Sequence, residues 1–198
     1  MSVKQQGKPI APVEKRTEAM QELLHEKGLM PEGFEDFFYD MVESWAPKNG
    51  ADVVAKAWLE ADFKERLAQD ATAACAELGY KGPQGEYMFM LENAPKLQNV
   101  VVCTQCSCTA WPILGFPTDW YKSPEYRARL VKNARSVLSE LGLNLPEDVE
   151  IRVYDTTAET RYFVLPERPE GTEDWTHEQL AAIVSREAMV GIARAEVS

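Results

Sequence analysis

The segment NVVVCTQCSC (residues 99–108) combines a β-branched run with three closely spaced cysteines. Its β-branched run, residues 100–102, predicts a short strand that leads directly into Cys103. Three of the four cysteines fall within the next six residues, which we call the cysteine loop (residues 103–108). In a cytosolic chain, such clustering indicates metal or redox chemistry rather than a disulfide framework.

The sequence pattern changes at Gly79, upstream of the cysteine loop. Before Gly79, apolar residues at helical spacing predict helices over residues 14–27, 34–45 and 51–78. From Gly79 onward, turn signals separate expected strands at 87–91, 99–102, 150–154 and 160–165 and expected helices at 126–141 and 176–186. This order predicts an α+β fold, with an N-terminal helical arm over residues 1–78 followed by a mixed α/β metal-binding domain over residues 79–198.

Composition narrows the class of protein. The chain has 198 residues, of which 45% are hydrophobic, and this is typical of a globular protein. Its formal charge of −11 disfavours nucleic-acid binding, because phosphate backbones repel an acidic surface. No window approaches the roughly 20 apolar residues of a membrane span. Residues 1–12 lack the apolar core of a secretory signal, so we expect a cytoplasmic protein.

Two common metal sites fit the cysteine loop poorly. A structural zinc site takes four nitrogen or sulfur ligands, normally from two separated pairs, and the loop offers three thiols with no histidine nearby. An iron–sulfur cluster needs four thiolates in most cases. Cys75 would have to be the fourth, but it lies in an Ala-rich helical run and is interpreted as a small buried residue.

Backbone nitrogens complete the coordination sphere better. Metal–sulfur bonds of about 2.3 Å place two cis sulfurs about 3.3 Å apart, which suits Cys106 and Cys108 with one residue between them. If the amides of Ser107 and Cys108 lose their protons, sulfur and nitrogen atoms of residues 106–108 form three fused chelate rings around one metal. Cys103 adds an axial sulfur, and one octahedral position stays open for substrate, as in a catalytic site.

This ligand set selects the metal and requires compensating charge. Removing protons from peptide nitrogens requires a strongly acidic ion, so Fe(III) or Co(III) fits and Zn(II) does not. Three thiolates and two deprotonated amides against a trivalent ion leave a charge of about −2, which needs cationic partners when buried. No Lys or Arg lies between Gln98 and Tyr121. The cations must therefore come from elsewhere in the fold or from another chain.

The sequence VCTQCSCT (residues 102–109) resembles the metal-binding claw motif of nitrile hydratase α subunits. The resemblance covers most of the chain after Gly79, through GY (79–80), GPQGEY (82–87), WPILG (111–115), WYKS (120–123), EYRAR (125–129), IRVYDTTAETRY (151–162) and LP (165–166). It implies an enzyme that hydrates small nitriles to amides on a low-spin non-haem Fe(III).

The resemblance also implies roles for particular residues. Cys103, Cys106, Ser107 and Cys108 would hold the metal, with Cys106 oxidised to the sulfinate, Cys108 to the sulfenate and Cys103 left a thiolate. The sulfenate oxygen of Cys108 would act as nucleophile or base toward the nitrile carbon. Gln84 would orient water or substrate, although its residue type alone fits a turn equally well. Trp111 would line the apolar pocket, or else fill the core.

Partners follow from the same resemblance and from the charge argument. We expect a β subunit that donates arginines to the cysteine oxygens in an αβ or α2β2 enzyme, and a metallochaperone or activator that loads the metal. Arg127, Arg129 and Arg161 are interpreted as members of structural salt bridges. Substrate preference and regulation by nitric oxide and light are not encoded in recognisable motifs.

Alternative interpretations stay open at this point. Thr109 and the pair Ala110-Trp111 resemble the iron type, whereas Thr104 resembles the cobalt type and Gln105 departs from the usual Leu. The cobalt-containing alternatives are a cobalt nitrile hydratase or the metal subunit of a thiocyanate hydrolase. A different class is a non-catalytic metal-binding or dithiol redox protein that uses only Cys103 and Cys106.

Overall fold

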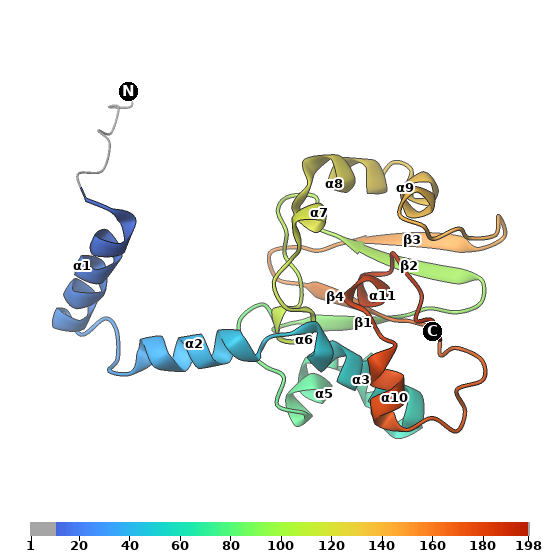
Figure 1. The fold of residues 1–198 in the computed structure, drawn as a ribbon, viewed down its shortest axis with the longest axis horizontal. Helices are drawn as coiled ribbons and strands as arrows, with labels where there is room; N and C mark the ends of the chain where they lie inside the picture. The colour runs from blue at the N-terminus through green and yellow to red at the C-terminus, as the bar shows by residue number, and fades with distance from the viewer. Residues whose placement is uncertain (1–10, 198) are drawn as a thin grey trace. The chain divides into compact units, whose positions relative to one another are not determined.

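The computed structural model describes residues 11–197, which form two compact units that divide between Val42 and Glu43 (Figure 1). The first unit contains helix α1 (Val13–Glu26) and most of α2 (Phe34–Ser44). Helix α1 is followed by Gly28 at φ +63°, the left-handed conformation that favours glycine after a helix. His25 contacts Glu35 over 2.7 Å and so joins the two helices. Residues 1–10, which make up most of the segment expected to lack a secretory signal, lie outside the described residues.

The second unit holds the remaining helices and all strands of the described chain. Its helices are α3 (Pro47–Leu59), α4 (Ala61–Gln69), α5 (Ala71–Glu77), α6 (Trp111–Leu114), α7 (Asp119–Lys122), α8 (Pro124–Leu130), α9 (Ala134–Glu140), α10 (His177–Ala182) and α11 (Arg186–Val190). Its strands are β1 (Met88–Glu92), β2 (Leu97–Val102), β3 (Glu150–Asp155) and β4 (Arg161–Leu165). The α+β class predicted from the sequence is confirmed.

The strands form two parallel pairs rather than one sheet. Strand β1 pairs with β4, and β2 pairs with β3, so the neighbours β3 and β4 do not pair with each other. Helix α9 contacts β3, helices α4 and α5 contact β1, and helix α11 contacts both β4 and β2. Helix α11 therefore bridges the two strand pairs.

Strand β2 lies at the centre of the core. Val100, Val101 and Val102 are all buried, which agrees with the β-branched run in the sequence. The chain after α11 passes close to this strand: a Cβ added to Gly191 would lie 2.0 Å from the Asn99 carbonyl oxygen. Glycine at 191, where φ is +91°, therefore allows the backbone of the C-terminal segment to approach β2.

Of two helical features expected from the sequence, one long helix is wrong and one N-terminal cap is confirmed. The helix expected over residues 126–141 is two helices, because the chain leaves α8 at Val131 and the Asn133 side chain caps α9 by accepting from the Ser136 N–H. The expected cap at Thr176 is confirmed, and its side chain forms a reciprocal capping box with Gln179.

Within residues 11–197, every helix is too short or too polar to span a membrane. Helices α3, α4 and α5, which the sequence analysis assigns to the arm, lie in the second compact unit, where α4 and α5 contact β1. The division into domains at residues 78 and 79 stays a prediction.

Candidate metal centre

The cysteine loop begins where strand β2 ends. Val102, the last residue of β2, pairs with Asp155 at the end of β3, and the N–H of Thr156 donates to the Val102 carbonyl over 2.8 Å. Cys103 is 1% exposed, whereas Cys106 is exposed and Cys108 is partly exposed. The loop therefore leads from the buried end of a strand pair to the molecular surface.

The three sulfur atoms of the loop converge. The Sγ atoms of Cys103 and Cys106 are 3.3 Å apart, those of Cys106 and Cys108 are 2.9 Å apart, and all three lie within 4.8 Å of one another. Cis thiolates on one metal ion are separated by about 3.3 Å when metal–sulfur bonds are about 2.3 Å. The spacing therefore fits three sulfurs on adjacent corners of one coordination sphere.

Backbone amides of the loop point toward the sulfurs. The Cys106 N–H donates to Cys103 Sγ over 3.3 Å, and the Cys108 N–H also faces this sulfur. The Ser107 N–H donates to no acceptor among residues 11–197. A backbone wrapped in this way leaves the nitrogens of Ser107 and Cys108 available as ligands.

The thiol pKa values show why the cluster needs a cation. Burial opposes ionisation of Cys103, but hydrogen bonds from Thr156 and from the amides of Cys108 and Cys106 outweigh it and lower the pKa to about 7. Burial, followed by the contact with Cys106 and the charges of the neighbouring sulfurs, raises the pKa of Cys108 to about 12. The charges of Cys103 and Cys106 therefore oppose ionisation of Cys108, and a bound metal cation would offset this repulsion.

Two side chains hold the start of the loop at Thr104. The Asp155 carboxylate accepts from the Thr104 N–H over 2.9 Å and from its hydroxyl over 2.5 Å. From helix α8, Arg127 Nη1 donates to the Thr104 carbonyl over 3.2 Å. Thr104 is thus bound through its N–H, hydroxyl and carbonyl by residues from two other elements.

Two hydroxyl groups hold the end of the loop at Cys108. The Tyr121 hydroxyl donates to the Cys108 carbonyl over 3.3 Å. The Thr156 hydroxyl, whose one proton is shared with Cys103 Sγ, is 3.4 Å from the same oxygen. Burial raises the pKa of Tyr121 well above its usual value, so the phenol stays protonated and remains a donor.

Gln84 is placed by Arg161, which comes from the start of β4. Gln84 has φ +64°, and its side-chain oxygen accepts from Arg161 Nε over 2.7 Å and from Arg161 Nη2. Arg161 is 3% exposed and also donates to the carbonyls of residues 157, 158 and 160. Its positive charge favours the thiolate of Cys108.

The arginines correct one expectation from the sequence. Arg129 forms the expected ion pair, with Glu140. Within the described part of the chain, Arg127 and Arg161 pair with no carboxylate and donate to uncharged oxygens, so their interpretation as members of salt bridges is wrong. The net negative charge expected at the cysteine loop could have identified Arg161, because that charge required a cation from elsewhere in the fold.

Trp111 belongs to an aromatic cluster after the loop. Its ring lies 5.5 Å from that of Trp45 and 5.0 Å from that of Phe116, measured between ring centroids. Its indole N–H is buried and has no partner among residues 11–197. The cluster fits a role in packing, and a role for Trp111 in lining a substrate pocket stays a prediction.

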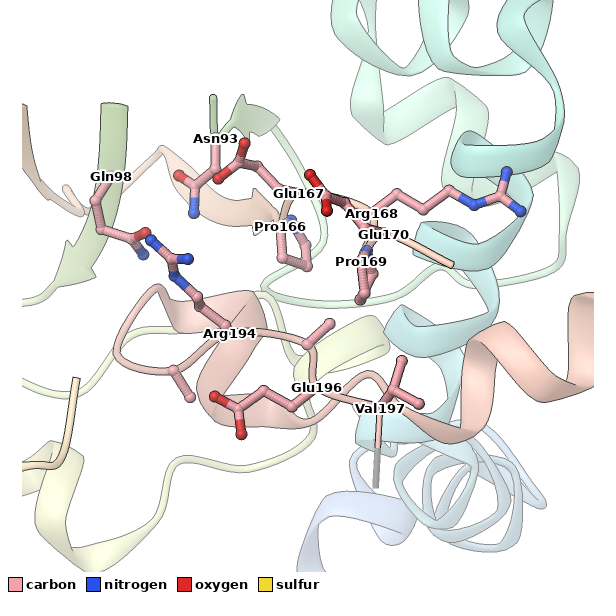
Figure 2. A pocket seen from close by; sticks show the side chains of 12 residues that line it. Asn93, Gln98, Pro166, Glu167, Arg168, Pro169, Glu170, Arg194, Glu196 and Val197 are labelled. Atoms are coloured by element: carbon pink, nitrogen blue, oxygen red, sulfur yellow. The ribbon is translucent and has the colours of Figure 1, made fainter. Parts of the chain in front are cut away.

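A cavity of about 540 Å³ lies away from the cysteine loop, between residues 166–170 and 193–197 (Figure 2). Figure 2 shows Gln98 and Arg194 on one side of this cavity, with Glu167 near Asn93. Neither the cysteines nor Gln84 nor Trp111 line it. It is therefore separate from the site that the sequence predicts.

The geometry defines a class of protein: an α+β protein whose cysteine loop presents three convergent thiols that could hold a metal ion. The chain matches the family model described as nitrile hydratase, alpha chain, over residues 11–193. The chain belongs to this family. Nitrile hydratase α subunits are part of a hydro-lyase and form complexes with β subunits.

The chain is similar to individual nitrile hydratase α subunits, one of which is named as cobalt-containing. A nitrile hydratase subunit alpha from Rhodococcus sp is 50% identical over 89% of this chain and 90% of its own length. A low-molecular weight cobalt-containing nitrile hydratase subunit alpha from Rhodococcus rhodochrous is 49% identical over 89% of this chain and 86% of its own.

The similar solved structures include both an iron-type and a cobalt-containing enzyme. A double mutant of the Fe-type nitrile hydratase from Comamonas testosteroni Ni1 is 47% identical, covers 92% of this chain and 89% of its own, and has a TM-score of 0.80. A recombinant thiocyanate hydrolase with partially modified cobalt centres is 41% identical, covers 95% of this chain and 92% of its own, and has a TM-score of 0.83. The family is therefore established, whereas the metal is not decided by similarity.

Proposed function

We propose that this chain is the catalytic metal-binding subunit of a nitrile hydratase that converts nitriles to amides. In this proposal the sulfurs of Cys103, Cys106 and Cys108 and the backbone nitrogens of Ser107 and Cys108 hold one trivalent ion. The observation that carries it is the convergence of three sulfurs within 4.8 Å, with the Cys108 N–H turned toward them.

We propose low-spin Fe(III) as the metal, with Co(III) as the alternative. The support is local: Thr109 resembles the iron type, is 4% exposed and donates to the Gly115 carbonyl over 3.4 Å. The space beside it is about 10 Å³, which is room for about one water molecule. A tyrosine, the residue expected in the cobalt type, would not fit there without rearrangement of its neighbours.

When bound, a trivalent ion with one free position supplies Lewis-acid activation of the nitrile or of water. Gln84 orients the reacting groups. Arg161 occupies its side-chain oxygen, so the amide NH₂, which has no acceptor among the described residues, is left to donate to water or substrate. The oxygen on an oxidised Cys108 would serve as base or nucleophile, and Trp111 would line the apolar part of the pocket.

We also propose that a β subunit completes the site. Cys106 is exposed and Cys108 partly exposed in the isolated chain. The charge of Arg161 alone does not offset a site of about −2, and Arg127 binds the Thr104 carbonyl rather than a sulfur. Arginines from a β subunit would bind the cysteine oxygens and close the pocket over a small nitrile. Loading by a metallochaperone and a cytoplasmic location stay predictions.

The test compares two cysteine variants in the chain co-produced with its β subunit. Cys106→Ser removes a proposed ligand, so metal content and acrylonitrile hydration should both be lost. Cys75→Ala is the matched control, because Cys75 is fully buried in α5 and outside the cluster. Equal metal content in the two variants would contradict the proposed centre. The chain produced alone should lack most of the activity.

A second candidate is thiocyanate hydrolysis, favoured by the TM-score of 0.83 to a thiocyanate hydrolase. Supplying thiocyanate in place of acrylonitrile distinguishes the two activities. The dithiol redox alternative uses the 3.3 Å pair of Cys103 and Cys106. It predicts a metal-free protein with a reversible disulfide, which intact-protein mass spectrometry would detect.

A further inference from the structure

The carbonyl of Cys108, at the end of the cysteine loop, is contacted by two hydroxyl groups. It accepts from the Tyr121 hydroxyl over 3.3 Å, and the Thr156 hydroxyl lies 3.4 Å away. These hydroxyl groups come from different parts of the fold, since Tyr121 lies on α7 and Thr156 follows β3. The loop end is therefore tied to both elements.

Cys108 has a special place among the proposed ligands, because it contributes both its nitrogen and its sulfur. The two atoms belong to one residue and close a five-membered chelate ring. Their direction depends on the backbone torsions of that residue, and a fixed carbonyl limits those torsions. A hydrogen bond to the Cys108 carbonyl thus acts on two ligand atoms at once.

The packing around Tyr121 keeps its hydroxyl beside the Cys108 carbonyl. Its ring is 2% exposed and packs against Trp120 and Tyr126, with ring centroids 5.7 Å and 6.1 Å away. The rigid ring fixes the hydroxyl, whose acceptor among residues 11–197 is the Cys108 carbonyl. Neighbouring Tyr126 is buried too, but its hydroxyl has no partner within the described residues.

We propose that Tyr121 is a positioning residue of the metal centre, which orients the chelating residue Cys108 through its carbonyl. This inference rests on the proposed function, because it needs a metal bound by Cys108. Tyr121 touches neither the substrate nor the metal in this proposal. Its hydroxyl sets how tightly and in what geometry the metal is held.

The chain provides a matched pair of variants. Tyr121→Phe removes the hydroxyl that donates to Cys108, and Tyr126→Phe removes a buried hydroxyl without a partner from the same aromatic cluster. Both are compared with the unaltered protein as complexes with the β subunit. The measurements are metal release to a chelator, the thiolate-to-metal absorption band, the oxidation state of Cys108 by peptide mass spectrometry, and thermal melting.

We expect Tyr121→Phe to release metal about fivefold faster, the change that corresponds to losing one hydrogen bond. Its absorption band should shift, and its kcat should fall more than its KM changes. Tyr126→Phe should match the unaltered protein in all these measurements. Metal-free Tyr121→Phe should melt only about 2–4 °C below metal-free Tyr126→Phe, the cost of one hydrogen bond, so metal release and absorption are the deciding measurements.

Two results would overturn the inference. One is a Tyr121→Phe protein whose metal release and absorption equal those of Tyr126→Phe. The other is a lower melting temperature of metal-free Tyr121→Phe with unchanged metal release, which would make the contact merely structural. If the unaltered protein binds no trivalent metal, the proposed function itself fails, and that result is separate from the comparison of the two variants.

Discussion

The guanidinium of Arg161 donates to the side-chain oxygen of Gln84, with 2.7 Å between Arg161 Nε and Gln84 Oε1. The contact joins the turn before β1 to the start of β4, and these two strands are paired. Because Arg161 occupies the amide oxygen of Gln84, the amide NH₂ is the end that is left to donate a hydrogen bond. The contact also places a buried positive charge where it favours the thiolate of Cys108.

Arg161→Lys should lower nitrile hydration about 10- to 100-fold, the usual effect of disturbing a residue that supports a metal site. Lysine keeps the charge but cannot reproduce the planar fork that serves Gln84 and three carbonyls. The measurement is kcat with acrylonitrile at equal metal content. Arg129→Lys is the control, because its ion pair with Glu140 is on the surface, and it should retain activity. Equal activity in the two variants would remove Arg161 from the site.

Asp155→Ala should loosen the start of the cysteine loop. It removes the acceptor of the Thr104 N–H and hydroxyl, at 2.9 Å and 2.5 Å. Because the contact is exposed, we expect a loss of only about 1 kcal/mol in unfolding free energy, together with faster metal loss. Asp148→Ala is the control, since Asp148 pairs with Lys96 at the end of the β2–β3 pair opposite to the loop. Urea unfolding and metal release are measured, and identical metal release in both variants would exclude the role of Asp155.

Gly191→Ala should destabilise the fold strongly. The new Cβ would lie 2.0 Å from the Asn99 carbonyl oxygen at the strand that carries the cysteine loop. Gly142→Ala is a matched control, because Gly142 also has a left-handed φ, of +98°, but no atom within 4 Å of the added Cβ. The control should cost about 1 kcal/mol from backbone strain alone. Denaturant melts of both variants check this, and equal stabilities would refute the close approach.

Cys75 should stay unreactive in the folded protein. Burial raises the pKa of its thiol from 9.0 to about 12, so at pH 8 only about one molecule in ten thousand carries the reactive thiolate. Because the folded pKa is raised, the stability contributed by this thiol is complete below about pH 9 and is lost as the pH rises through 12. Iodoacetamide mapping of the metal-free protein should label Cys106 well before Cys75. Early labelling of Cys75 in the folded state would contradict its burial.

Local sequence signals predicted the local features of this structure. The β-branched run before Cys103 is the buried strand β2, and Thr176 with Gln179 forms the capping box that their spacing indicates. The three thiols converge because they lie within one loop, so short-range reasoning was sufficient for them.

Contacts between distant residues could not be read in the same way. The hydrogen bond from Arg161 to Gln84 spans 77 positions, and the contact between Thr156 and the Cys108 carbonyl spans 48. Both depend on the parallel pairing of β1 with β4 and of β2 with β3, which periodicity alone does not determine. The break at Asn133 was missed because its flanks continue the helical pattern, while the side-chain cap starts a new helix.

The most direct test of the account is X-ray absorption spectroscopy at the metal edge of the loaded αβ protein. We predict a trivalent ion with three sulfur neighbours at about 2.3 Å and two nitrogen neighbours at about 2.0 Å, the nitrogens being the deprotonated amides of Ser107 and Cys108. A divalent ion, or a shell of sulfurs without backbone nitrogens, would contradict the proposed centre.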